Sequence, residues 1–159
     1  KGKFKKVIFN SYYDLEEKLF SSVVEQKFDI LIHAAAVSDY IPKNIDKSIK
    51  IDSQKQNISI DFKKTPKMVN SIKAKSKNKN IKLVAFKLTA DQDEEKRIKK
   101  IKNLFQQSNA DLIVQNDISK RIGNVQTGYN IYNLKSKVFS TSNSKELGEK
   151  ILNEIKSVL

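Results

Sequence analysis

The segment from Phe28 to Tyr40 constrains the fold of this chain more than any other. It reads FDILIHAAAVSDY, an apolar strand that runs into three alanines and then a Ser-Asp pair. Alanines at a strand end remove side-chain bulk, so a ligand or a helix terminus can come close to the backbone. Open α/β sheets bind ligands at the carboxyl edge of their strands. We therefore expect a ligand edge here, where Asp39 could accept hydrogen bonds from a sugar or a base.

Strand-like and helix-like segments alternate along the chain, a pattern typical of a mostly parallel sheet. The predicted strands are 6–10, 28–36, 57–62, 82–88 and 111–116, with a β-hairpin within 129–140. The predicted helices are 11–26, 65–77, 91–108 and 144–159. The expected fold class is α/β, a three-layer Rossmann-like sheet with helices on both faces and a C-terminal β-hairpin.

One domain over residues 1–159 is expected, because 38% hydrophobic residues suffice for a single core. Residues 40–55 are polar and aperiodic, which predicts a long, mobile flap. The absence of cysteine excludes disulfides and thiolate metal sites, and the single histidine, His33, is expected in the core rather than on a metal. No metal site is predicted. The apolar run 30–37 is too short to cross a membrane, and we expect a cytoplasmic protein.

The net charge of +13 raises the alternative of a basic nucleic-acid-binding module. Two observations argue against it. Arg97 and Arg121 are the only arginines, whereas bidentate recognition of bases and phosphates favours arginine. The lysines are also spread along the chain, apart from segments 70–80 and 96–102. A polyanionic small substrate would account for part of the charge.

Four segments in order resemble phosphopantothenate–cysteine ligase, the phosphopantothenoylcysteine synthetase of coenzyme A biosynthesis. They are AAAVSDY with Pro42, KIDS from Lys50, KKTPKMV from Lys63, and AFKLTAD ending at Asp91. ADLIVQNDIS at 110–119 is similar to the family's later strand with its Asn-Asp pair. The sequences of these motifs resemble those of the short monofunctional ligases more than those of the bifunctional enzyme.

The family's N-terminal Gly-Gly-Thr turn and its Asn-x-Ser-Ser/Thr-Gly segment have no counterpart among the four glycines here. The chain therefore resembles the C-terminal two-thirds of the ligase, with the N-terminal glycine-rich segment missing. That segment could be supplied in cis or in trans. Without it, we do not expect the chain to catalyse the full reaction.

The resemblance implies a two-step amide synthesis. The carboxylate of 4′-phosphopantothenate attacks the α-phosphate of CTP or ATP, pyrophosphate leaves, and the amine of cysteine attacks the acyl-nucleotide. Mg²⁺ and lysine would stabilise the anionic transition states. The implied partners are therefore 4′-phosphopantothenate, cysteine, a nucleoside triphosphate and a second copy in a homodimer.

The resemblance also implies roles for individual residues. Lys50, on the flap, would be the catalytic cation, although Lys43, Lys47 and Lys55 show that it could be one solvated lysine among several. Asn116 and Asp117 are possible pocket residues, a role that competes with turn formation. The implied nucleotide-binding residues are Ala34, Ala35, Ala36, Asp39, Pro66, Lys67, Met68, Val69, Phe86 and Lys102. Ordinary packing, helix initiation or solvation would explain each of these as well.

A second alternative is an NAD-dependent epimerase or reductase, because DILIHAAA is similar to a strand of those enzymes. They need Tyr-x-x-x-Lys, which places both reacting groups on one helix face. None of the five tyrosines here is followed four positions later by lysine, and the glycine-rich fingerprint is absent. Both observations weigh against this class.

Overall fold

The structure is a computed structural model that describes the chain except for residues 1–3, 44–53, 55, 91–92 and 158–159. It divides into two compact units. The larger contains the residues up to Ala35 and those from Met68 onward, and the smaller is Ala36–Lys67. Each unit is considered by itself.

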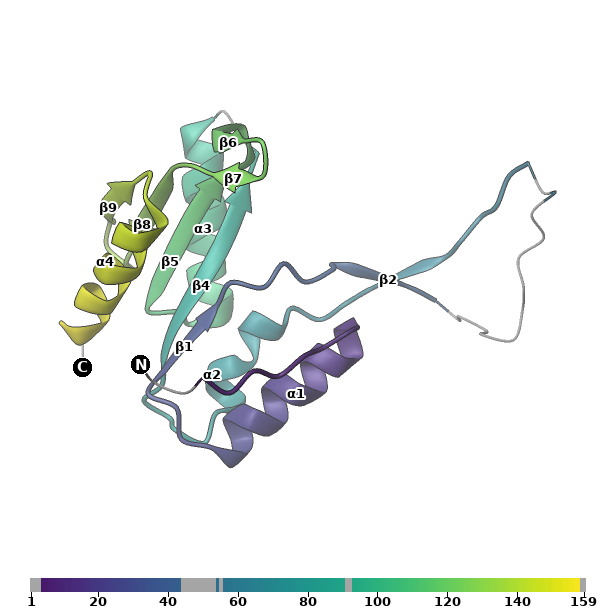
Figure 1. Cartoon of the computed structure of the whole chain (residues 1–159), viewed down its shortest axis with the longest axis horizontal. Coiled ribbons are helices and arrows are strands. Elements are labelled where there is room, and N and C mark those ends of the chain that lie inside the picture. The colour runs from purple at the N-terminus through teal and green to yellow at the C-terminus, as the bar shows by residue number, and fades with distance from the viewer. Residues whose placement is uncertain (1–3, 44–53, 55, 91–92, 158–159) are drawn as a thin grey trace. The chain divides into compact units, whose positions relative to one another are not determined.

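The larger unit is built on a five-stranded sheet of order β1-β4-β5-β8-β9 (Figure 1). Its strands are β1 (Ile30–His33), β4 (Lys82–Thr89), β5 (Leu112–Asp117), β8 (Tyr129–Tyr132) and β9 (Lys137–Thr141). Strands β1, β4 and β5 are parallel, whereas β8 and β9 join antiparallel. The sheet is therefore mixed rather than mostly parallel, because the predicted C-terminal hairpin pairs with β5 and extends the sheet.

Three helices of 13 to 15 residues flank this sheet, and each begins at a side-chain cap. They are α1 (Tyr12–Glu25), α3 (Glu94–Ser108) and α4 (Ser144–Lys156). The side chain of Asp93 accepts hydrogen bonds from the N–H groups of Glu95 and Lys96, and Asn143 caps α4 in the same way. Such caps satisfy backbone donors that the first helical turn leaves open.

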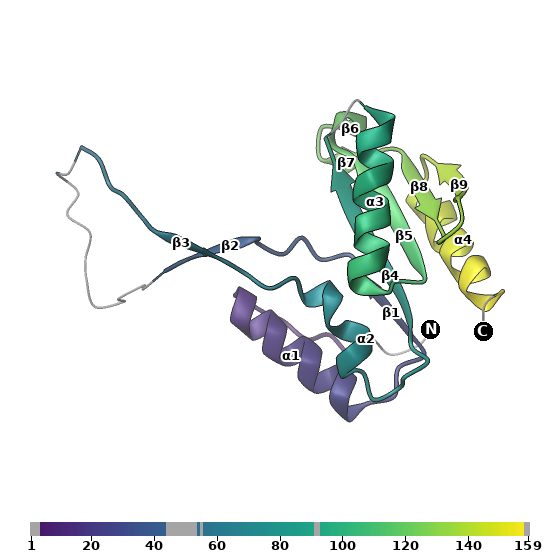
Figure 2. The same cartoon turned by 180° about the vertical axis from the view of Figure 1, so that it is seen from behind.

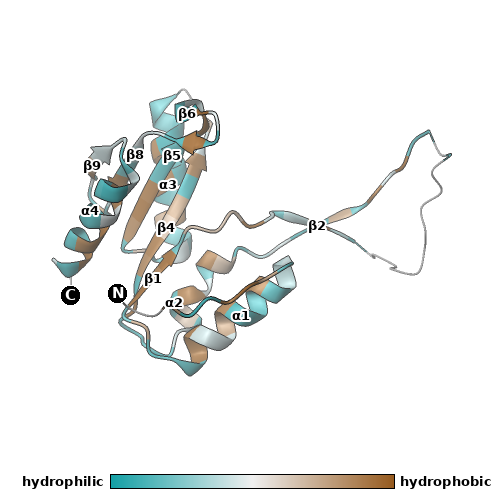
Figure 3. Cartoon of the chain, viewed as in Figure 1, coloured by the Kyte–Doolittle hydropathy of each residue, from teal (hydrophilic) through white to brown (hydrophobic). Residues whose placement is uncertain are grey.

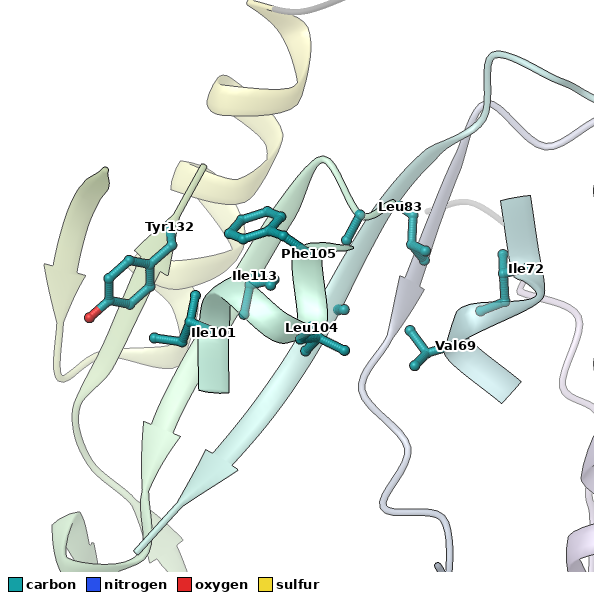
Figure 4. Close-up of a cluster of buried hydrophobic side chains, with 10 residues drawn as sticks. Val69, Ile72, Leu83, Ile101, Leu104, Phe105, Ile113 and Tyr132 are labelled. Carbon is teal, nitrogen blue, oxygen red and sulfur yellow. The ribbon is translucent and has the colours of Figure 1, made fainter. Parts of the chain in front are cut away.

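Helix α3 covers one face of the sheet (Figure 2). Ile101, Leu104 and Phe105 from this helix pack on Leu83 and Ile113 of the central strands (Figure 4). Val69 and Ile72 belong to the same buried cluster, and Leu19 and Phe20 of α1 pack against it. This face thus holds one half of the core.

Helix α4 covers the opposite face. Leu147, Ile151 and Ile155 pack against Val84 and Val114. Much of β4 and β5, the strands between α3 and α4, is coloured as hydrophobic (Figure 3). Apolar residues on both faces of β4 and β5 are what a strand buried between two helix layers requires. The prediction of three layers with helices on both faces is confirmed.

Three predicted elements differ in the structure: the strand 6–10, the helix 65–77 and, in the smaller unit, the strand 57–62. Residues 6–10, predicted as a strand, are described without regular secondary structure. The predicted helix 65–77 is instead a 3₁₀ turn, η1 (Met68–Asn70), followed by the single-turn helix α2 (Ile72–Lys75). The side chain of Ser71, which precedes α2, makes no capping hydrogen bond.

The smaller unit contains an antiparallel ribbon of β2 (Tyr40–Pro42) and β3 (Phe62–Lys64). β2 lies inside the segment predicted as a flap, and the predicted strand 57–62 contributes only its last residue. Between β5 and β8, the larger unit carries η2 (Ile118–Lys120) and the two-residue strands β6 (Arg121–Ile122) and β7 (Val125–Gln126). Among the described residues, no helix is long and apolar enough to cross a membrane.

Candidate functional site

The predicted catalytic cation, Lys50, lies outside the described residues, as does most of the predicted flap 40–55. Its role therefore stays a prediction. Within the flap range, the structure describes 40–43 and 54. Of these, β2 is paired and Lys43 donates its N–H to the carbonyl of Asp61 over 2.7 Å.

Asp39 and Lys67 meet at the base of the ribbon. The Lys67 ammonium lies 3.0 Å from an Asp39 carboxylate oxygen. Thr65 holds the two ends together, because its N–H donates to the carbonyl of Asp39 at 2.9 Å and its hydroxyl donates to the carbonyl of Ser38 at 2.6 Å. Thr65 is buried, whereas Asp39, Pro66 and Lys67 are exposed. Two predicted nucleotide-binding side chains are thereby brought together at the surface.

The three alanines follow β1 and are exposed. Ala34 and Ala35 end the first part of the larger unit, and Ala36 begins the smaller one. Their small side chains leave the backbone after β1 open to solvent, which is the property that the sequence pattern predicts.

Met68 and Val69 are buried, at 3% and 8% exposure. Val69 belongs to the core cluster under α3, so any contact with a ligand would use its backbone. The expectation of a helix N-terminus at Pro66 is wrong: η1 and the four-residue α2 replace the helix. A ligand here would meet a turn, without the aligned dipoles of a long helix.

Phe86 and Asn116 share one face of the sheet near its carboxyl edge. Asn116 is opposite Leu88, two residues after Phe86 on the neighbouring strand. Both are half-buried, and Phe86 packs against the cluster under α4. Because β1, β4 and β5 are parallel, their carboxyl ends, with Ala34 and Ala35 after β1, lie at the same edge.

Asp117 points to the other face. Its carboxylate accepts hydrogen bonds from the N–H and hydroxyl of Ser119, at 2.9 and 2.6 Å, and from the hydroxyl of Thr89 at 3.0 Å. The hydroxyl of Ser119, with these other donors and the nearby positive charge of Arg97, lowers the pKa of Asp117 below its usual value of 3.8. Asp117 also caps η2, so the turn-forming role is present.

A chain of polar side chains on the α3 face was not predicted. The amide nitrogen of Gln115, which is 2% exposed, donates to the hydroxyl of Thr89 at 2.8 Å, and Asn130 donates to the Gln115 oxygen at 2.6 Å. Ser140 in turn donates to Asn130 at 2.7 Å. The signal was available, since alternate residues of β4 and β5 turn polar after Ala85 and Ile113.

Gln115, Asn130 and Ser140 line a cavity of about 460 Å³, together with Arg97, Lys120 and Asp117. It opens on the α3 face, whereas Phe86 and Asn116 face α4. The cavity and the side chains of Phe86 and Asn116 therefore lie on opposite faces of the sheet.

Lys102 is exposed on α3, where it lines a groove with Tyr132 and Lys135. Eight residues of helix, about 12 Å, separate it from Glu94 at the helix start. The structure does not bring it to the carboxyl edge of the sheet beside Asn116.

His33 ends β1 opposite Ala85 and is half-buried. Burial lowers the pKa of His33 below 6.5, which favours the neutral imidazole. The sequence predicts a core histidine, whereas the structure leaves His33 half-buried at the end of the strand. Within the described ranges, no group of three or more His, Cys, Asp or Glu side chains is placed to hold a metal ion.

The chain is an α/β protein with a mixed five-stranded sheet, whose parallel strands have small and polar residues at their carboxyl edge. Residues 5–159 match the family described as the DNA/pantothenate metabolism flavoprotein C-terminal domain. The chain belongs to this family, and the resemblance derived from its motifs is confirmed.

Two archaeal proteins described as coenzyme A biosynthesis bifunctional protein CoaBC are similar in sequence. The protein from Methanocaldococcus jannaschii is 26% identical over 83% of this chain, and that from Thermococcus kodakarensis is 27% identical over 92%. This chain spans 32% and 35% of their lengths, about a third in each case.

Solved structures share the fold. The DNA/pantothenate metabolism flavoprotein from Streptococcus pneumoniae has a TM-score of 0.78 at 24% identity, over 95% of this chain and 72% of that one. The C-terminal domain of a CoaBC protein scores 0.65 at 23%, over 96% and 64%. A Cab2 variant in complex with phosphopantothenate-cysteine scores 0.60 at 17%, over 91% and 48%.

Proposed function

We propose that this chain is the larger part of a phosphopantothenate–cysteine ligase, which joins 4′-phosphopantothenate to cysteine through an acyl-nucleotide. The observation that carries the proposal is the family match over residues 5–159. The CoaBC relatives are described as coenzyme A biosynthesis proteins, and the solved Cab2 complex holds phosphopantothenate-cysteine. The epimerase and nucleic-acid alternatives have no comparable support.

The nucleotide, CTP or ATP, would lie at the carboxyl edge of β1, β4 and β5. Ala34, Ala35 and Ala36 would let it approach the backbone, Phe86 would pack on the base, and Asn116 would hydrogen-bond to it. Asp39 would accept bonds from sugar or base hydrogens, beside Pro66, Lys67 and the backbone of Met68 and Val69. Asp117 and Lys102 are weaker candidates, since one is engaged in a turn and the other lies along α3.

In this proposal, Lys50 and a Mg²⁺ ion would stabilise the transition states of the reaction. Both would place positive charge on the phosphoryl oxygens as the substrate carboxylate attacks and pyrophosphate leaves. The net charge of +13 suits a protein that binds two phosphorylated substrates.

We further propose a homodimer that uses the smaller unit. Tyr40 is opposite Lys64 and Pro42 is opposite Phe62, so these four side chains share one face of the ribbon. Tyr40 and Phe62 are 58% and 57% exposed. An isolated two-stranded ribbon is marginally stable, and a second copy would cover its apolar face.

The experiment that tests the function is calorimetric titration of CTP and of ATP into the chain extended through the upstream residues of its own reading frame. Saturable binding of one nucleotide in the presence of Mg²⁺, weakened by Phe86→Ala, supports the proposal. Leu134→Ala is the control, because Leu134 is exposed in the turn between β8 and β9. Binding of neither nucleotide would contradict the function.

A further inference from the structure

The cavity on the α3 face has a charged and polar lining that the proposed ligase reaction leaves unused. Its volume of about 460 Å³ is in the range of small-molecule sites. The charged side chains of the lining are Arg97, Lys120 and Asp117, and most of the other lining residues carry a hydroxyl or an amide. Of the proposed nucleotide-binding residues, only Asp117 lines this cavity, whereas Phe86 and Asn116 face α4. The cavity is therefore a second candidate site.

A chain of hydrogen bonds crosses the sheet at this cavity in a single direction. The Ser140 hydroxyl donates to the Asn130 oxygen at 2.7 Å, and the Asn130 nitrogen donates to the Gln115 oxygen at 2.6 Å. The Gln115 nitrogen donates to the Thr89 hydroxyl at 2.8 Å, and that hydroxyl donates to the Asp117 carboxylate at 3.0 Å. Because an ionised carboxylate can only accept, Asp117 sets the direction of every donor in the chain.

This direction leaves defined groups for a ligand. The Ser140 hydroxyl gives its proton to Asn130, so its oxygen can serve a ligand only as an acceptor. A side-chain amide carries two N–H groups, and within the described part of the chain Asn130 donates only one of them, to Gln115. Ser140 and Asn130 both line the cavity. The lining thus offers an acceptor for a ligand hydroxyl and a donor for a ligand oxygen.

Lys120 is held at the cavity through its backbone and its aliphatic stem. The N–H and the hydroxyl of Thr127 both donate to the Lys120 carbonyl, at 2.7 and 2.6 Å. Gly128 has a φ of +91°, which favours glycine, and a Cβ there would touch the Cβ and Cγ of Lys120 at 3.4 Å. Among the described residues, the Lys120 ammonium forms no ion pair. Its charge is therefore available to a ligand.

The charges around the cavity favour an anion. The Asp117 carboxylate already accepts three hydrogen bonds, two from Ser119 and one from Thr89. The Ser119 hydroxyl, with the other donors and the charge of Arg97, lowers the pKa of Asp117, so this one negative charge is compensated within the chain. Arg97 and Lys120 supply two positive charges. Arginine and lysine bind carboxylates and phosphates through charge-assisted hydrogen bonds.

We propose that this cavity binds a small hydroxylated oxyanion, a class that includes phosphate monoesters and hydroxy acids, at a site separate from that of the nucleotide. Lys120 and Arg97 would bind the anionic oxygens. The second N–H of Asn130 would donate to a ligand oxygen, and Ser140 would accept from a ligand hydroxyl. Stability alone does not require this arrangement, because apolar groups can replace both partners of a buried hydrogen bond at little cost.

The test is titration of the chain, followed by NMR of its amides, with glycerol 3-phosphate, malate and inorganic phosphate. The first two probes combine an anion with a carbon-bound hydroxyl, and the third has no such hydroxyl. We expect one of the first two to shift the Asn130 side-chain amide and the Gly128 amide saturably. Its affinity should exceed that of inorganic phosphate at least about tenfold, since it makes one more hydrogen bond. The preferred probe identifies the anion as phosphate or carboxylate.

Two results of this titration would overturn the proposal. Equal affinities for the three probes would show that the site does not recognise a hydroxyl. Shifts that spread over exposed lysines without saturating would show only general attraction to a chain of net charge +13.

A matched pair of variants separates the cavity from the net charge. Lys120→Gln and Lys135→Gln each remove one positive charge from an exposed side chain of the larger unit, but only Lys120 lines the cavity. Lys120→Gln should weaken binding of the preferred probe about tenfold, and Lys135→Gln by less than about twofold. Equal losses in the two variants would overturn the proposal.

Competition shows whether the cavity is separate from the nucleotide site. In the extended chain, saturating CTP or ATP with Mg²⁺ should leave the affinity of the probe unchanged. Displacement of the probe would make the cavity part of the nucleotide site and would overturn the proposal. Probe binding in an extended chain that binds neither nucleotide would contradict the ligase function and support the separate site.

Discussion

The ammonium of Lys67 lies 3.0 Å from the carboxylate of Asp39 across the base of the β2–β3 ribbon. The two side chains are 41% and 58% exposed. Exposed ion pairs contribute about 0–1 kcal/mol to stability. The pair is therefore a weak explanation for folding, and its location beside exposed backbone leaves both charges accessible to a ligand.

Replacing Asp39 with Asn should separate these roles. In the extended chain, we expect the unfolding free energy to change by less than about 1 kcal/mol. Nucleotide affinity should fall about tenfold, which corresponds to one lost charge-assisted hydrogen bond of about 1.4 kcal/mol. Calorimetry and urea unfolding measure the two quantities, with Asp61→Asn as a control in the same unit. Equal affinities for the two variants would remove Asp39 from the site.

The neighbours Gln115 and Asn116 should respond differently to substitution. Gln115 is buried and bridges Thr89 and Asn130, so Gln115→Leu removes one hydrogen-bond partner from each and should lower stability by about 1–3 kcal/mol. Asn116→Ala should cost less stability and weaken nucleotide binding in the extended chain. Urea unfolding measures the stability of both variants, and calorimetry measures their nucleotide binding. A stable Gln115→Leu protein would show that the polar chain contributes little.

Stability should depend on pH through His33, the only histidine in the chain. Burial lowers its pKa in the folded state, so the unfolded state binds the proton at a higher pH. The free energy of unfolding should therefore decrease as pH falls below about 6.5, by at most about 1.4 kcal/mol per unit for one proton. Asp117, whose pKa is lowered, affects stability only below about pH 4.

Urea unfolding of the chain and of His33→Gln between pH 7.5 and 5 measures this dependence. The decrease should be present in the chain and absent from the variant. The same decrease in both proteins would show that His33 is not its source.

The proposed dimer makes Phe62 a sensitive position. Phe62 is exposed and pairs across the ribbon with Pro42, on the same face. Phe62→Lys therefore places a charge in the proposed contact. Light scattering should detect a dimer for the chain and a monomer for the variant. Ile122→Lys is the control, because Ile122 is 74% exposed in the larger unit. A monomeric parent chain at high concentration would contradict this assignment.

The elements predicted well are those whose residues decide their structure locally. Helix α3 has an Asp cap and an apolar stripe, and β4 and β5 each contain an apolar run, so all their bounds lie within three residues of the predictions. The shared location of Ala34 and Asn116 is also predictable, because the carboxyl ends of parallel strands lie at the same edge of a sheet.

The parts predicted poorly depend on partners that the local sequence does not contain. Residues 6–10 have the pattern of a strand, but a strand forms only where another pairs with it, and no described strand pairs with this segment. The helix predicted at 65–77 shortens because Val69 and Ile72 are drawn into the core under α3. The alternating polar residues of β4 and β5 indicate a polar face near Gln115, but they do not identify the hydrogen-bond partners on β8 and β9.

The most direct test of the central claim is the release of pyrophosphate from CTP and from ATP, each with 4′-phosphopantothenate and Mg²⁺. It compares the extended chain, its Lys50→Gln variant and a Lys43→Gln control. We predict release by the extended chain with one nucleotide, retained by the control and lost in Lys50→Gln. No release with either nucleotide would contradict the assignment of this chain to the ligase reaction.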